Sequence, residues 1–146
     1  MRSLALLAVT AAVALAGCGT AEKNDYVKSV NDATTQMTKA LTSVGNVGTD
    51  PAQMATTLQQ GSAAIEKAAK NFEAIDPPAN AKHAHGLMVD GLHSLAATFN
   101  DAAAAAKAKD TKKVVEELTN LQSSDGAKKI QQAQTELQKN GYKFQG

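Results

Sequence analysis

Four side chains in this sequence carry a thiol or an imidazole, groups that act as nucleophiles or metal ligands: Cys18, His83, His85 and His93. Imidazole binds transition metals and transfers protons near neutral pH, and a thiolate is both a nucleophile and a metal ligand. On one helix, His83 and His85 point about 200° apart, and His85 and His93 lie roughly 12 Å apart along the axis. This spacing excludes direct sharing of one ion by these histidines.

His85 is the histidine with the best route to a ligand role, because other helices can bring partners to it. A metal site there needs carboxylates such as Glu73 or Asp76. Met88 lies on the same helix face, and histidine and methionine both ligate haem and copper, but the sequence has no Cys-x-x-Cys-His for covalent haem. We predict no cofactor and no metal. His85 then packs at one end of the domain with its nitrogens at water, and the other two histidines lie on the surface.

The remaining candidates for catalysis lack the context that catalysis needs. Ser62 and Ser94 have no glycine-elbow sequence around them, and no Gly-Lys-Ser/Thr loop is present to bind phosphate. Glu116 and Glu117 are adjacent on a predicted helix, so their carboxylates diverge by about 100°. We therefore predict a protein that is not an enzyme and has no catalytic residues.

The first 17 residues have the parts of a secretory signal. Arg2 supplies a positive start, Leu4–Leu15 is almost entirely apolar, and Ala16 and Gly17 are the small residues that a signal peptidase requires. The apolar run is about 12 residues long, against the roughly 20 that span a bilayer as a helix. We predict that residues 1–17 are a signal peptide rather than a permanent anchor.

The stretch Leu15-Ala16-Gly17-Cys18 resembles the lipobox of bacterial lipoproteins. That resemblance implies a diacylglyceryl group on the sulfur of Cys18, cleavage just before this residue, and frequent acylation of the new amino group. Cys18 is also the only cysteine, so it has no disulfide partner within the chain. We predict lipid attachment at Cys18 and a location on the extracytoplasmic face of the cell membrane.

Composition limits the partners of the domain that follows. Charged residues make up 20% of the chain and hydrophobic residues 43%, which is typical of a globular domain, but aromatic residues make up only 3%. Arg2 is the only arginine, and beyond the signal 14 lysines balance 14 acidic residues. A neutral domain without arginine lacks the field and the bidentate donors used on nucleic acids. We predict no nucleic-acid partner.

Helical periodicity recurs in four segments, at about 22–44, 51–76, 78–109 and from 111 onward. Asp50 and Pro51 form a helix start, Asp110 is a second cap, and the glycines of 45–48 and the Pro77-Pro78 pair end helices. The apolar stripes consist of Tyr26, Val30, Ala33, Met37, Leu41 and Val44; Met54, Leu58, Gly61, Ile65, Ala69 and Phe72; Ala81, His85, Met88, Leu92, Leu95, Phe99, Ala102 and Ala106; and Val114, Leu118, Leu121, Ile130, Ala133 and Leu137. In the fourth segment the stripe rotates by roughly 100° across 123–126, which indicates a kink or break.

Short connections between long helices favour antiparallel neighbours. We therefore predict an all-α, up-down-up-down four-helix bundle whose fourth helix is kinked or broken near 123–126. The domain organisation is a signal peptide (1–17), a lipidated tether (18–24) and the bundle (25–146). The run of five alanines at 102–106 favours helix but offers little burial, and the aromatic tail Gly141–Phe144 can fold back over the bundle end.

The domain also resembles small helical lipoproteins of actinobacteria, through Ile75-Asp76-Pro77-Pro78-Ala79 followed by His85, and through Leu137 to Tyr142. The resemblance implies a helical domain on the cell envelope and no functional residue besides Cys18. Two functions follow. The first is a non-catalytic, lipid-anchored module with a structural role or an envelope protein as partner. The alternative is a small-ligand or metal-binding lipoprotein with its site near His85 at one bundle end.

Overall fold

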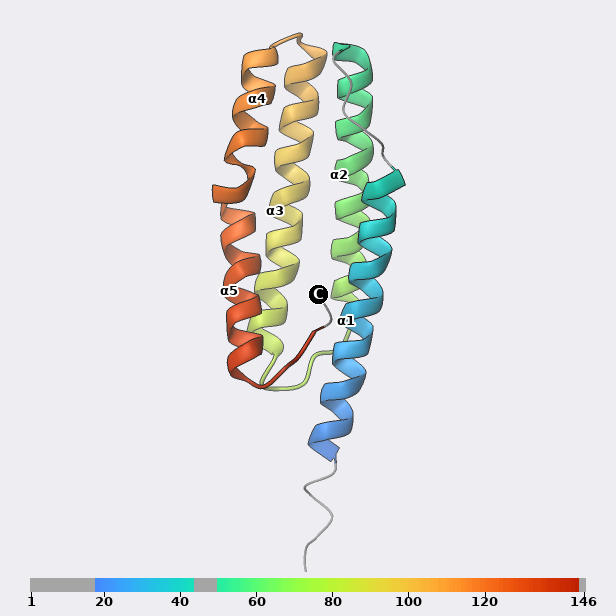
Figure 1. The fold of residues 1–146 in the computed structure, drawn as a ribbon, viewed down its shortest axis with the longest axis vertical. Coiled ribbons are helices and arrows are strands. Elements are labelled where there is room, and N and C mark those ends of the chain that lie inside the picture. The colour runs from blue at the N-terminus through green and yellow to red at the C-terminus, as the bar shows by residue number, and fades with distance from the viewer. Residues whose placement is uncertain (1–17, 44–49, 145–146) are drawn as a thin grey trace, which may run out of the picture.

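The protein is an all-α four-helix bundle in this computed structural model, which describes residues 18–43 and 50–144 (Figure 1). The first three helices are α1 (Cys18–Ser43), α2 (Pro51–Glu73) and α3 (Lys82–Lys107). The fourth rod consists of α4 (Thr111–Thr119), the 3-10 helix η1 (Asn120–Ser123) and α5 (Asp125–Lys139). Successive rods alternate in direction, which confirms the predicted up-down-up-down topology. The predicted signal peptide, Val44 and the glycines of 45–48 lie outside the described residues.

Helix starts follow from side chains that accept hydrogen bonds from exposed backbone N–H groups. Asp50 accepts from the amides of Ala52 and Gln53, with Pro51 in the first helical position, and Asp110 accepts from Lys113. Each cap satisfies donors that the helix itself leaves unpaired. Both predicted helix starts are therefore confirmed.

The predicted break in the fourth rod is confirmed at Ser124. The backbone of Ser124 is extended, with φ −62° and ψ 159°, and its hydroxyl accepts a hydrogen bond from the amide of Ala127 at 3.2 Å. One residue thus ends η1 and caps α5. The break allows Val114 on one side and Leu137 on the other to be buried, each nearly completely, despite the rotated stripe.

Small side chains build much of the core. The first of two core clusters also contains larger side chains, among them Tyr26, Ile65, Phe72, Leu92 and Leu137. The second cluster lies between α2, α3 and α4 at the opposite end of the bundle. The expectation that the five-alanine run contributes little burial is wrong, because all of it except Ala104 is buried in this second cluster. These methyl groups are buried together with Leu58 of α2 and Val114 of α4, so alanine here is a core residue.

Glycine lets two helices touch backbone to backbone where α3 crosses α5. An ideal Cβ built on Gly91 would lie 2.8 Å from the carbonyl oxygen of Gly126, and one built on Gly126 would lie 2.7 Å from that of Gly91. At Gly61 of α2, the ring of Phe99 lies 3.0 Å from the position of an added Cβ. The α3–α5 crossing is the closer of the two contacts.

Residues 18–24, predicted as a tether, lie in the first turns of α1, which begins at Cys18. The first turns of α1 extend past the ends of the other helices (Figure 1). The helix pattern was expected to begin near Glu22. The sequence from Gly19 to Glu22 contains no proline that would interrupt a helix.

The aromatic tail folds back over one end of the bundle, as expected. Tyr142 is 2% exposed, its hydroxyl donates to the side-chain oxygen of Asn80 at 2.6 Å, and its ring meets that of Tyr26 edge-on. Gly141, at φ +80°, makes the turn that directs the tail inward. Residues 142–144 thereby join α1 to the α5 end (Figure 1).

Candidate functional site

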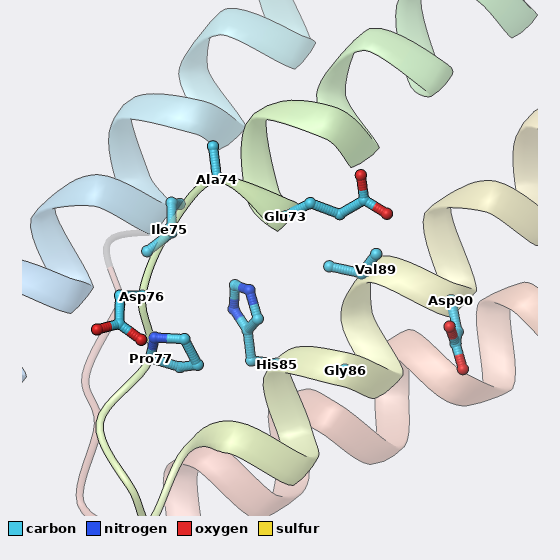
Figure 2. A pocket seen from close by; sticks show the side chains of 9 residues that line it. All are labelled: Glu73, Ala74, Ile75, Asp76, Pro77, His85, Gly86, Val89 and Asp90. Atoms are coloured by element: carbon cyan, nitrogen blue, oxygen red, sulfur yellow. The ribbon is translucent and has the colours of Figure 1, made fainter.

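The hollow around His85 is a shallow space of about 400 Å³ beside the α2–α3 connection (Figure 2). His85 itself is buried, and its Nδ1 lies 3.1 Å from the hydroxyl of Tyr26 on α1. The ring also hydrogen-bonds the backbone of Phe72 at the end of α2. The expectation that its nitrogens face water is therefore wrong. His85 is a polar cross-link between three helices.

Electrostatics keep this cross-link uncharged. Burial lowers the pKa of His85, against the raising effects of the Phe72 backbone and of Asp76. Burial, with a smaller contribution from Tyr142, raises the pKa of Tyr26 to about 12. At neutral pH the pair is a neutral imidazole and a neutral phenol, so the hydrogen bond between them carries no activated nucleophile.

The carboxylates near His85 do not complete a metal site with it. Figure 2 shows the carboxylates of Glu73, Asp76 and Asp90 pointing in different directions, away from the imidazole ring. Among residues 18–43 and 50–144, no group of three His, Cys, Asp or Glu side chains is placed to hold a metal ion. The arrangement around His85 thus fits packing and hydrogen bonding.

His83 is exposed on the surface, as predicted, whereas His93 is half-buried. His83 contacts the carboxylate of Glu136 at 2.8 Å. His93 joins α3 to α2 by placing Nδ1 2.9 Å from Glu66 and Nε2 3.1 Å from Glu73. Glu73 was considered above as a second metal ligand beside His85. In the structure Glu73 pairs with His93 instead. These two glutamates lie seven residues apart, two turns along α2, a spacing that marks one helix face.

We expect the contribution of His93 to stability to disappear as the pH rises. Hydrogen bonds to Glu66 and then Glu73 raise its pKa above the ordinary 6.5. The contribution is complete below about pH 6.5 and is lost as the pH rises through the raised pKa of the folded state. Urea unfolding should therefore show His93→Gln destabilised at about pH 5.5, with a smaller difference from the wild type at about pH 8.5.

His85 provides the opposite pH dependence and hence a control. Because its pKa is lowered, its contribution is complete above about pH 6.5 and is lost as the pH falls through the lowered folded-state value. His85→Leu should therefore destabilise the protein less in acid than in alkali, the reverse of the pattern expected for His93→Gln. An equal His93→Gln effect at both pH values would contradict the role of Glu66 and Glu73.

Two serines considered as nucleophiles are occupied by backbone contacts. The buried hydroxyl of Ser62 donates to the carbonyl of Ala96 at 2.8 Å, and that of Ser94 donates to the carbonyl of Asp90 at 2.9 Å. Neither contact involves a base that could activate the hydroxyl. Glu116 is exposed and Glu117 is half-buried on α4, each next to the other along the helix.

A cleft of about 640 Å³ lies between α1 and α5 and is called here the α1–α5 cleft. Its apolar lining consists of Val30, Met37, Phe72, Met88, Leu92, Ile130, Tyr142 and Phe144. Its polar lining consists of Asn31, Thr34, Gln134, Gln138 and Lys143. All four rods and the tail thus contribute to one predominantly apolar space, as small-molecule sites do.

The cleft exists because one seam of the bundle is open. α3 packs closely against α2 and α5, whereas α1 packs mainly against α2 and only lightly elsewhere. The Gly91–Gly126 contact draws α5 toward α3, on the side away from α1. Large side chains that a closed bundle would bury, such as Met37 and Ile130, are left half-buried along the seam.

Sequence reasoning missed this cleft. It assigned the apolar residues of the cleft to the helix stripes as core, and periodicity cannot distinguish a core position from a cleft wall. A signal was available in the pair Met37 and Met88, since methionine adapts to irregular spaces. That signal is weak by itself, because methionine also serves as an ordinary packing residue.

The fold and its hollows define an all-α four-helix bundle with an open apolar seam. No helix in the described part of the chain has the length and hydrophobicity needed to cross a membrane. Compared with protein-family models, curated proteins and solved structures, the chain matches none of them.

Proposed function

We propose that the protein is a non-catalytic binding protein, anchored by a lipid on Cys18 at the extracytoplasmic face of the cell membrane. In this proposal the ligand occupies the α1–α5 cleft. The observation that carries it is the cleft, an apolar space of about 640 Å³ walled by all four rods. That volume lies within the roughly 300–1,000 Å³ of small-molecule sites.

Support for the anchor comes from the N-terminal end. Leu15 to Cys18 resembles a lipobox, and Cys18 is the first residue of α1. The first turns of α1 extend beyond the bundle (Figure 1). A rigid helical extension between a lipid and the bundle would hold the cleft above the bilayer surface.

The cleft favours ligand binding over the envelope-protein partner considered from the sequence. A contiguous exposed apolar patch is the feature that marks a surface for a protein partner. Val89 is buried and Leu87 is half-buried against the core, so neither supplies such a patch. Among the described residues, Val115 is the one large apolar side chain that is strongly exposed, at 63%.

Loss of the Cys18 thiol is expected to remove the anchor. Mass spectrometry of the wild-type protein from its native membrane should show a diacylglyceryl-modified Cys18 as the N-terminal residue. Cys18→Ser should carry no lipid and should be released or mislocalised, with its helical circular dichroism unchanged. Two acyl chains bind a membrane stably, so their loss changes the distribution of the protein almost completely.

The matched control is Ala21→Ser, which places the same hydroxyl at an exposed position one turn further along α1. It should remain lipid-modified and membrane-bound. An unmodified wild-type protein beginning at another residue would overturn the anchored function.

A further inference from the structure

We propose that the α1–α5 cleft binds the acyl chain of a long-chain fatty acid, with the carboxylate of the fatty acid at Lys143. This inference rests on the proposed function and names its ligand class. Three properties of the cleft carry it: an elongated shape, an apolar floor, and a rim whose charge has one sign.

The shape fits a chain better than a compact ring. On α5 the lining runs from Ile130 to Gln138, about 12 Å along the helix axis, and on α1 it runs from Val30 to Met37 in the same direction as the seam. The tail residue Phe144 adds length at the bundle end. A single acyl chain lying between the two helices would follow this seam.

The floor is apolar and adaptable. Phe72, Met88 and Leu92 form it from α2 and α3, and Met37 faces them from α1. Methionine side chains are unbranched and flexible, so they accommodate chains of varied shape. Every methylene removed from water against this floor adds favourable transfer free energy, so affinity should increase with chain length.

The rim determines the head group. Lys143 is exposed and is the one charged side chain among the described residues that line the cleft, none of which carries a carboxylate. Asn31, Gln134 and Gln138 add amide groups that can hydrogen-bond an oxygen. An ammonium group without a competing carboxylate at the rim complements an anion and disfavours a cationic head group.

The test uses the full chain carrying Cys18→Ser, which has no acyl group of its own to enter the cleft. Titration with the fluorescent fatty acid cis-parinarate, followed by displacement with palmitate, should show saturable binding at one molecule per chain. Palmitate should bind more than about tenfold more tightly than octanoate, because it buries more methylenes. Absence of saturable binding would overturn the proposal.

Two tryptophan variants place the ligand in the cleft. Thr34 is exposed and lines the cleft, whereas Thr35 is exposed on the same helix and does not line it. Thr34→Trp should fill the cleft and weaken palmitate binding by about tenfold or more, while Thr35→Trp should bind as the parent does. Thermal unfolding of both checks that they are folded. Equal binding by the two variants would overturn the proposal.

A charge variant tests the head group. Lys143→Gln should weaken palmitate binding several-fold and leave binding of hexadecanol, the uncharged analogue, unchanged. The control Lys67→Gln alters an exposed lysine of α2 that does not line the cleft and should have no effect. Equal losses for palmitate and hexadecanol would overturn the assignment of the carboxylate to Lys143.

Other occupants of the cleft give different results. A dimer that Thr34→Trp dissociates, without palmitate binding, would assign the cleft to a second copy and overturn the fatty acid. Native mass spectrometry of the anchored protein from its membrane separates this inference from the proposed function. A bound mass other than a fatty acid, lost in Thr34→Trp, would overturn the ligand class while the binding function stands.

Discussion

Alanine in place of Gly91 is expected to lower the free energy of unfolding by about 3 kcal/mol, at the upper end of the usual cost of overpacking a core. The added methyl would lie 2.6 Å from Cγ1 of Ile130 and 2.8 Å from the carbonyl oxygen of Gly126. The Ile130 side chain can rotate away, but the carbonyl oxygen belongs to the backbone of α5. Relief therefore requires α5 to move away from α3. Urea unfolding followed by circular dichroism measures the loss.

Gly86→Ala on the same helix is the matched control. No heavy atom lies within 4 Å of a Cβ built on Gly86, which is exposed. Here alanine should stabilise the protein by about 0.5–1 kcal/mol, because glycine is the poorer helix former. A similar change in stability for both variants would contradict the view that the close contact between α3 and α5 requires a glycine at position 91.

The contrast between these glycines shows where sequence reasoning stopped. Periodicity and caps predicted the four rods, their alternation and the break at 123–126, because these features depend on residues close together in the chain. Gly126 was assigned to the break, and its contact with Gly91 was not foreseen. That contact depends on which faces of α3 and α5 meet, and both faces contain several small residues that fit equally well.

The alanine run illustrates the same limit in terms of burial. Propensity identified residues 102–106 as strongly helical, but the free energy of burial depends on what surrounds a methyl group. Val114 of α4 and Leu58 of α2 lie in the same cluster as Ala102 and Ala106, so the run is enclosed on two sides. The turn at Asp110 that brings α4 back against α3 was predicted, and the resulting core was not.

The candidate site was predicted least well. The alternative function placed a ligand or metal site near His85, because histidine is a common ligand, whereas in the structure the buried ring contacts Tyr26 and the backbone of Phe72. The α1–α5 cleft arises from the absence of a close contact between two helices. Its apolar lining residues are ordinary core types and its polar ones are ordinary surface types, so residue type and spacing do not mark the cleft in the sequence.

Alanine in place of Tyr26 is expected to cost about 3–5 kcal/mol, as for other large aromatic residues removed from a core. Its ring lies edge-on to those of His85, Tyr142 and Phe144, with centroids 5.7, 5.5 and 6.5 Å away. These contacts join α1 to α3 and the tail, where α1 has few others. We expect unfolding in urea at lower concentration, and faster hydrogen exchange in α1 than in α3.

Tyr26→Phe separates the ring from its hydroxyl. Phenylalanine keeps the three aromatic contacts but leaves Nδ1 of the buried His85 without the partner 3.1 Å away. An unpaired buried polar group costs about 1–3 kcal/mol, so this variant should fall between the wild type and Tyr26→Ala. Hydrogen exchange in α1 should then remain close to that of the wild type, because packing rather than the hydrogen bond holds the helix. Loss of α1 protection in Tyr26→Phe as large as in Tyr26→Ala would show instead that the Tyr26–His85 bond docks α1.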